Sequence, residues 1–185
     1  MRIIFAFLLF LPTAALAQNF TTALEVDLTG DGLIDRVELR ETSMGGDADM
    51  NIWVRTADGQ LDLRSQSKSV VWVGGIGQQP ELAVTPHGSL LVQSMNESIG
   101  RDRWHQTLTV AWRGNAFVLA GYTYEWYDTL DLSNAGKCDV NLLNGKGELS
   151  RGQESTHKST FRTKTRGGPI DIWDGNPPKE CFPDN

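Results

Sequence analysis

The chain has 185 residues, of which 39% are hydrophobic and 22% charged, and its formal net charge is −6. That length suits a single domain with a sizeable core. The acidic balance argues against nucleic acid or an anionic membrane as the main partner.

Residues 1–17 are predicted to be a cleavable secretion signal. Met1-Arg2 supplies one positive charge, residues 3–11 are apolar, and Ala15-Leu16-Ala17 is a small-x-small pattern that a signal peptidase accepts. The apolar run is too short for a bilayer, which needs roughly 20 residues. We therefore expect an exported protein, periplasmic or secreted, that consists of residues 18–185 and has no transmembrane segment.

Residues 27–35 form an acidic loop between two alternating, strand-like segments. Oxygen ligands fall where a calcium loop needs them, at Asp27, Thr29, Asp31 and Asp35 with the carbonyl of Leu33. Gly32 stands where such a loop makes its sharp turn. The pattern predicts a calcium site with a structural role. The alternative is a plain turn, in which the Asp side chains accept local backbone amides.

This stretch resembles the FG-GAP or VCBS-type repeat, whose calcium loops occur in the blades of integrin-α-like β-propellers. The resemblance is confined to one short segment and occurs once. It implies a β-meander with a calcium-stabilised turn. The repeat normally has a carboxylate or Asn where this chain has Thr29, and a hydroxyl is a weaker ligand, so we expect weak calcium binding.

The rest of the chain reads as short strands joined by turns. Alternating segments flank residues 86–88 and the two-residue hairpin signal Gly114-Asn115, and Asp58-Gly59 and Asn144-Gly145 look similar. We expect an all-β fold of about ten strands, an antiparallel meander of hairpins resembling a β-propeller fragment. A two-sheet β-sandwich is the alternative. Residues 18–185 would form one domain, with an irregular tail at 167–185.

The hairpin around Gly114-Asn115 carries a candidate recognition face. If these residues form a two-residue turn, Arg113 pairs with Ala116, and the register brings together Arg103, His105, Tyr122, Tyr124 and Trp126. Aromatic rings beside hydrogen-bonding groups suit a sugar ring or a peptide, so we predict that these residues bind a ligand. The alternative is that the rings form a second core layer under another sheet.

Cys138 and Cys181 are the two cysteines of the chain. An even count in an exported protein predicts a disulfide. This bond would pin the Pro-rich tail onto the body of the domain.

Catalytic signatures are missing from the sequence, which has no Gly-x-Ser-x-Gly elbow, no His-Glu-x-x-His and no phosphate-binding glycine loop. We therefore expect a non-catalytic binding or structural protein that recognises a glycan or a protein of the cell envelope. The alternative is an envelope hydrolase acting on polymers, which a deep pocket with two close carboxylates would favour.

Overall fold

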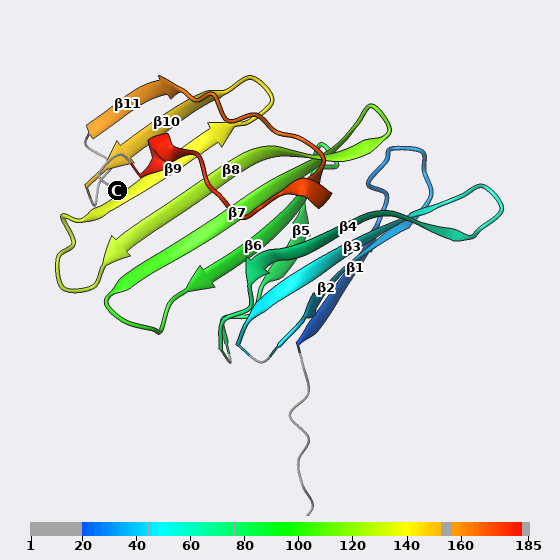
Figure 1. The fold of residues 1–185 in the computed structure, drawn as a ribbon, viewed down its shortest axis with the longest axis horizontal. Coiled ribbons are helices and arrows are strands. Elements are labelled where there is room, and N and C mark those ends of the chain that lie inside the picture. Colours follow the sequence, from blue (N-terminus) through cyan, green and yellow to red (C-terminus); the bar gives the residue numbers. More distant parts are fainter. Residues whose placement is uncertain (1–19, 44, 76, 153–156, 183–185) are drawn as a thin grey trace, which may run out of the picture.

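The computed structural model describes residues 20–43, 45–75, 77–152 and 157–182, so the predicted secretion signal at 1–17 lies outside the described residues. The described part is all-β, with eleven strands in two antiparallel sheets (Figure 1). The all-β prediction is confirmed. No helix among the described residues is long and apolar enough to cross a membrane.

The first sheet, sheet A, has four strands in the order of the chain: β1 (Thr21–Val26), β2 (Asp35–Glu41), β3 (Asp47–Arg55) and β4 (Leu61–Trp72). Burial alternates residue by residue along β2 and β3, as the side-chain period of a strand with one covered face requires. Sheet A is therefore a simple meander with one face toward the core.

The second sheet, sheet B, has seven strands, again neighbours in sequence: β5 (Glu81–Val84), β6 (Leu90–Asn96), β7 (Asp102–Arg113), β8 (Ala116–Asp128), β9 (Ala135–Asn141), β10 (Lys146–Arg151) and β11 (His157–Arg162). All four predicted turns join consecutive strands. Gly114 and Asn115 both have positive φ, at 55° and 67°, which a two-residue type I′ turn needs.

The core combines the inner faces of both sheets. Val37, Met50 and Ile52 of sheet A and Leu90 and Leu108 of sheet B are fully buried and belong to one cluster. Strand β4 lies close to β6 and β8, and β1 lies close to β5. Sheet A thus covers one part of the inner face of sheet B.

The chain after β11 covers a further part of that inner face. It crosses sheet B toward β4 and forms two short 3₁₀ turns, η1 (Ile170–Ile172) and η2 (Lys179–Cys181) (Figure 1). Ile170 is fully buried, the amide of Leu119 donates to the carbonyl of Gly168 at 2.9 Å, and the hydroxyl of Ser65 in sheet A donates to Asp171 at 3.1 Å. The tail therefore ties the two sheets together.

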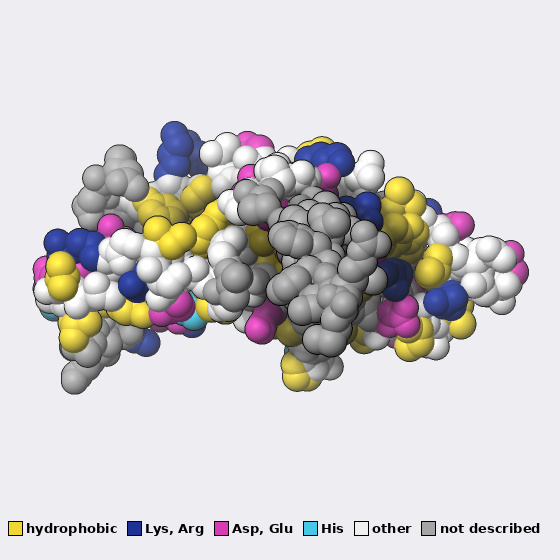
Figure 2. Space-filling view, turned by 90° about the horizontal axis from the view of Figure 1, so that it is seen from below, with side chains coloured by type: hydrophobic (Ala, Val, Ile, Leu, Met, Phe, Trp, Pro, Cys, Tyr) yellow, Lys and Arg dark blue, Asp and Glu magenta, His cyan; other side chains and the backbone are white. Residues whose placement is uncertain are grey.

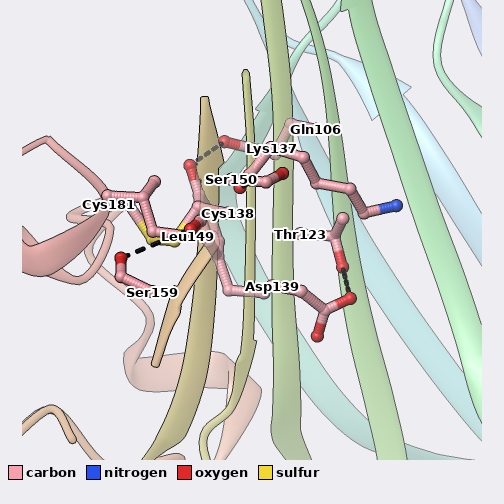
Figure 3. Close-up of a disulfide and its surroundings, with 10 residues drawn as sticks. Gln106, Thr123, Lys137, Cys138, Asp139, Leu149, Ser150, Ser159 and Cys181 are labelled. Atoms are coloured by element: carbon pink, nitrogen blue, oxygen red, sulfur yellow. Dashed lines mark hydrogen bonds between the residues drawn. A yellow bond between two sulfur atoms is a disulfide. The ribbon is translucent and has the colours of Figure 1, made fainter. Parts of the chain in front are cut away.

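A disulfide anchors the end of the tail. Cys138 of β9 is bonded to Cys181 with a Cα–Cα distance of 5.4 Å (Figure 3), so the predicted bond is confirmed. Both cysteines are buried. Neighbouring hydrogen bonds, such as that from Ser159 to the carbonyl of Leu149 at 3.3 Å, join β10 to β11 beside the bond.

The predicted register of β7 and β8 is correct only near the turn. Pairs from Arg113–Ala116 to Val110–Leu119 match the prediction, but Thr109 then pairs with Gly121 because Ala120 is an extra residue on β8. A β-bulge of one residue reverses the faces of every later side chain.

The expected pairs Thr107–Tyr122, His105–Tyr124 and Arg103–Trp126 are therefore wrong. Those rings pair instead with Leu108, Gln106 and Trp104. They lie on the inner face of sheet B, whereas Arg103 and His105 lie on the outer face.

Candidate ligand-binding site

A row of aromatic rings follows strand β8 on the inner face of sheet B. Tyr122, Tyr124 and Trp126 alternate along the strand and so point to one side. Trp104 of β7 extends the row sideways. The Trp104–Tyr124 and Tyr124–Trp126 ring centroids lie 6.1 and 6.0 Å apart, with planes inclined by 24° and 25°. These near-parallel rings form a continuous apolar surface.

Glycine on the next strand makes room for this surface. Gly136 of β9 pairs with Trp126. A Cβ atom at position 136 would collide with Cζ2 of Trp126 and would lie 2.6 Å from the carbonyl oxygen of Ser150. The indole therefore lies over a bare stretch of backbone, where only glycine fits.

Exposure differs along the row. Tyr122 is 1% exposed and contacts Trp173 of the tail, so the core-layer alternative is correct for this residue. Tyr124 and Trp126 are only partly buried. Phe182, which follows the disulfide, packs against Tyr124 with a centroid distance of 5.1 Å. The open part of the row is thus bounded on one side by the anchored tail.

A cavity of about 450 Å³ opens beside these rings. Its apolar lining includes Trp104, Tyr124, Trp126 and Phe182, and its polar lining includes Asp102, Arg103, Asn134 and Arg151. Ligand pockets commonly have volumes of roughly 300–1,000 Å³ and combine apolar walls with a few polar groups. The cavity takes residues from both faces of sheet B, since Trp104 lies on the inner face of β7 and Arg103 on its outer face.

Burial raises the pKa of Tyr124 to about 12, and the negative charge of Asp102 acts in the same direction. The Tyr124 hydroxyl is therefore a neutral hydrogen-bond donor and acceptor at physiological pH. Burial raises the pKa of Tyr122 as well. Asp102 supplies an acceptor near Tyr124, so the apolar wall has polar groups at its margin.

The loop between β8 and β9 is held by the buried carboxylate of Asp128. Its Oδ1 accepts the amide of Leu130 at 2.8 Å, and its Oδ2 lies 2.5 Å from Nη2 of Arg101. The Arg101 guanidinium lowers the pKa of Asp128, although burial opposes this shift. The amide of Asp128 also donates to the carbonyl of Asn134 at 3.0 Å. These contacts hold Asn134, the residue of this loop that lines the aromatic cavity.

His105 belongs to a different surface. It lies on the outer face of sheet B, where Nε2 is 2.5 Å from Oε1 of Glu97, and Tyr127 donates its hydroxyl to the same carboxylate at 2.6 Å. Burial disfavours ionisation of Glu97, but the hydrogen bonds from Tyr127 and His105 outweigh it and lower the pKa of Glu97. A second cavity of about 580 Å³ there includes His105, Glu125 and Lys137 in its lining, and it shares Trp126 and Tyr127 with the aromatic cavity.

The predicted ligand-binding residues are therefore only partly brought together. Tyr124, Trp126 and Arg103 share the aromatic cavity, while Tyr122 lies in the core and His105 on the outer face. Sequence reasoning missed Trp104, Asp102, Asn134, Arg151 and Phe182. One available signal was Gly121, because glycine inside a strand often marks a bulge, and a bulge there would have placed Trp104 opposite Trp126.

The predicted calcium loop is a turn rich in hydrogen bonds to Asp side chains. Asp27 accepts the amides of Gly30 and Gly32 at 2.7 and 2.8 Å, and Asp31 accepts that of Leu33 at 2.8 Å. Burial disfavours ionisation of Asp27, but the hydrogen bonds from Gly32 and Gly30 outweigh it and lower the pKa of Asp27.

The side chain of Asp35 points away from the loop surface. Asp35 is fully buried, and its carboxylate accepts the amides of Leu28, Thr29 and Arg55 at 2.9, 3.2 and 2.9 Å. Among the described residues, no three acidic, His or Cys side chains are grouped to hold a metal ion. A calcium ion would draw on Asp27, Asp31, the Thr29 hydroxyl and the Leu33 carbonyl, and it would compete with backbone amides for Asp27 and Asp31 as well as for the buried Asp35.

Each of four cavities in the described part of the chain has one acidic residue in its lining. These acidic residues are Glu125, Asp102, Glu81 and Asp174. Glycoside hydrolysis generally needs a pair of carboxyl groups on either side of the scissile bond. These four cavities do not offer that pair.

Comparisons with known proteins find no relative for this chain: no known protein family, characterised protein or solved structure matches it. The resemblance of the loop at 27–35 to FG-GAP repeats stays a prediction.

Proposed function

We propose that this protein is an exported, non-catalytic glycan-binding protein whose aromatic cavity holds a sugar unit of an envelope polysaccharide. The observation that carries the proposal is the partly exposed surface formed by Trp104, Tyr124 and Trp126 beside polar groups. A sugar ring presents apolar C–H groups on its faces and hydroxyls at its rim. It can therefore pack on an aromatic ring while its hydroxyls bond to neighbouring donors and acceptors.

The dimensions favour a small ligand over a protein partner. The cavity volume of about 450 Å³ falls in the range of small-molecule sites, whereas a stable protein interface buries roughly 800 Å² on each partner. Asp102, Asn134 and the Tyr124 hydroxyl offer both donors and acceptors at its margin. Such a mixture suits hydroxyl groups, each of which both donates and accepts a hydrogen bond.

Two features support export. The sequence of residues 1–17 has the three parts of a secretion signal. The Cys138–Cys181 disulfide joins two segments 43 residues apart, and disulfides form and persist mainly in oxidising compartments. We propose the periplasm or the exterior as the location.

Calcium at residues 27–35 would be a structural addition to this function. Asp27, Asp31, Thr29 and the carbonyl of Leu33 supply hard oxygen ligands, which calcium prefers. The loop lies at the end of sheet A between β1 and β2, and its residues do not line the aromatic cavity. We therefore assign the ion to stability and give it no part in glycan recognition.

A glycan array probed with residues 18–185 tests the proposal. We expect binding to a subset of saccharides, with the signal lost in Trp126→Ala and kept in Trp53→Ala, a matched change at a partly buried Trp on the outer face of sheet A. Trp126 is partly exposed but packs against the core, so its replacement should lower Tm by about 2–4 °C for each kcal/mol of stability lost and leave the protein folded.

Absence of any saccharide signal, or equal binding by both variants, would overturn the proposal. If Trp126→Ala unfolds the protein, the indole belongs to the core. Trp126→Phe, which keeps a ring over Gly136, then serves as the second variant. It should bind more weakly than the wild type at an unchanged Tm.

A further inference from the structure

We propose that the saccharide bound in the aromatic cavity carries a carboxylate, as a uronic acid does, and that Arg103 binds this group. The inference rests on the proposed function and names the chemical class of its ligand. Arg103 belongs to β7 and lines the cavity.

Arg103 has an unused hydrogen-bond donor. Its Nη1 is buried and has no hydrogen-bond partner among the described residues. A buried donor without a partner is unfavourable, and a guanidinium stays protonated at any physiological pH. The site therefore has a positive group with one unpaired donor, which a bound acceptor would satisfy once the guanidinium turns toward the cavity.

Two nearby carboxylates, those of Glu97 and Asp128, have other partners. The positive charge of Arg103 helps to lower the pKa of Glu97, but the Glu97 carboxylate is hydrogen-bonded to Tyr127 and His105. Asp128 is paired with Arg101. Neither carboxylate forms a hydrogen bond to Nη1 of Arg103, and the planar fork of a guanidinium matches the two oxygens of a carboxylate.

The positions of the charges give the ligand an orientation. Asp102 and Arg103 are consecutive on a strand, so their side chains leave opposite faces of the sheet, yet both line the same cavity. We place the hydroxyls of a sugar packed on Trp126 toward Asp102 and Asn134, which line the same cavity. Its carboxylate then lies around the end of β7, at Arg103, away from the negative charge of Asp102.

Calorimetric titration tests the inference with matched ligands. The probes are oligogalacturonate and oligomannuronate, each compared with its own methyl ester, which keeps the sugar skeleton and removes the charge. We expect at least one acid to bind wild-type protein tenfold or more tightly than its ester at low salt. That preference should shrink as salt is raised, because screening weakens charge–charge attraction.

Three variants separate the roles of charge, shape and fold. Arg103→Met should abolish the preference, and Arg103→Lys should keep part of it because the charge remains while the fork is lost. Arg113→Met, at the exposed turn end of the same strand, should leave it unchanged. A Tm for each variant shows whether it is folded, and Arg103→Lys gives the answer alone if Arg103→Met does not fold.

The outcomes distinguish the inference from the function on which it rests. If no acid binds more tightly than its ester, or if the Arg103 variants keep the full preference, the inference is wrong, and Trp126-dependent binding of neutral saccharides would leave the function standing. If the array shows no saccharide bound at all, the proposed function fails and the inference fails with it.

Discussion

Gly136 is the residue on which the shape of the aromatic surface most depends. Its missing side chain lets the indole of Trp126 lie against the backbone of β9. A methyl group there would meet both the ring and the carbonyl oxygen of Ser150, and backbone atoms yield less readily than the tip of a flexible side chain. The surface is therefore sensitive to the smallest possible substitution.

We expect Gly136→Ala to destabilise the protein by about 1–3 kcal/mol, the usual cost of overpacking, and to weaken saccharide binding because Trp126 must move. Urea unfolding and the glycan array measure the two effects. Gly75→Ala is the control, since a Cβ there would meet only Nε2 of Gln78 at 3.9 Å. Equal effects of the two substitutions would show that the contact with Trp126 is unimportant.

Asp128 makes stability depend on pH. Arg101 holds the pKa of Asp128 below its ordinary value, which is about 3.9 in an unfolded chain. A folded-state pKa that is depressed contributes stability above the unfolded pKa, and this contribution disappears as the pH falls through the folded value.

Asp128→Asn should therefore cost more stability at pH 7 than at pH 3. Urea unfolding of the wild type and the variant at both pH values measures this difference. A loss of the same size at the two pH values would mean that the ionised carboxylate contributes nothing and that only its shape matters.

The hairpins were largely predictable from the sequence, because glycine-containing turns and alternating residues mark strand ends and faces locally. The turns at Gly59, Gly88, Gly114 and Gly145 all join consecutive strands. The bulge at Ala120 was not predicted, because the turn at Gly114 and Asn115 sets the register only for the residues next to it. One extra residue was enough to move His105 out of the predicted site.

The tail illustrates a second limit of sequence reasoning. Two cysteines predicted the bond between Cys138 and Cys181, but not that Phe182 would reach Tyr124 or that Asp171 would accept a hydrogen bond from Ser65. Such contacts depend on the path of an irregular segment across two sheets. No local pattern in the sequence encodes that path.

The disulfide should contribute about 4 kcal/mol to stability in the chain-entropy description, since it closes a loop of 43 residues. We expect Cys138→Ser with Cys181→Ser to lose most of this free energy in urea unfolding. Because Phe182 follows the bond, the double variant should also bind saccharide more weakly. The denatured, non-reduced wild type should contain no free thiol, and two titratable thiols would contradict the assignment.

The molecule as a whole joins a four-stranded meander to a seven-stranded one, with the tail across both. Side chains of both charge signs are interspersed over the face shown in Figure 2. The loop between β1 and β2 lies in the four-stranded sheet, apart from the aromatic cavity. Stabilisation by calcium and recognition of saccharide should therefore be separable.

Calcium should raise the melting temperature without changing saccharide affinity. A ligand bound only by the folded state adds about 2.7 kcal/mol at a hundredfold excess over its Kd, and we expect a Kd of roughly 10⁻⁴–10⁻³ M, as in extracellular modules. Melting curves in millimolar calcium and in chelator measure the shift. An identical shift in Asp31→Ala, or none in the wild type, would contradict binding at this loop.

The most direct test of glycan recognition is to follow the indole N–H signals of the six tryptophans by two-dimensional NMR while adding a saccharide selected on the array. Single substitutions assign each signal. The aromatic cavity predicts that Trp104 and Trp126 shift together and saturate with one affinity, while Trp53 and Trp112 do not move. Unchanged signals at Trp104 and Trp126 under saturating saccharide would show that the sugar binds elsewhere and would contradict the proposed site.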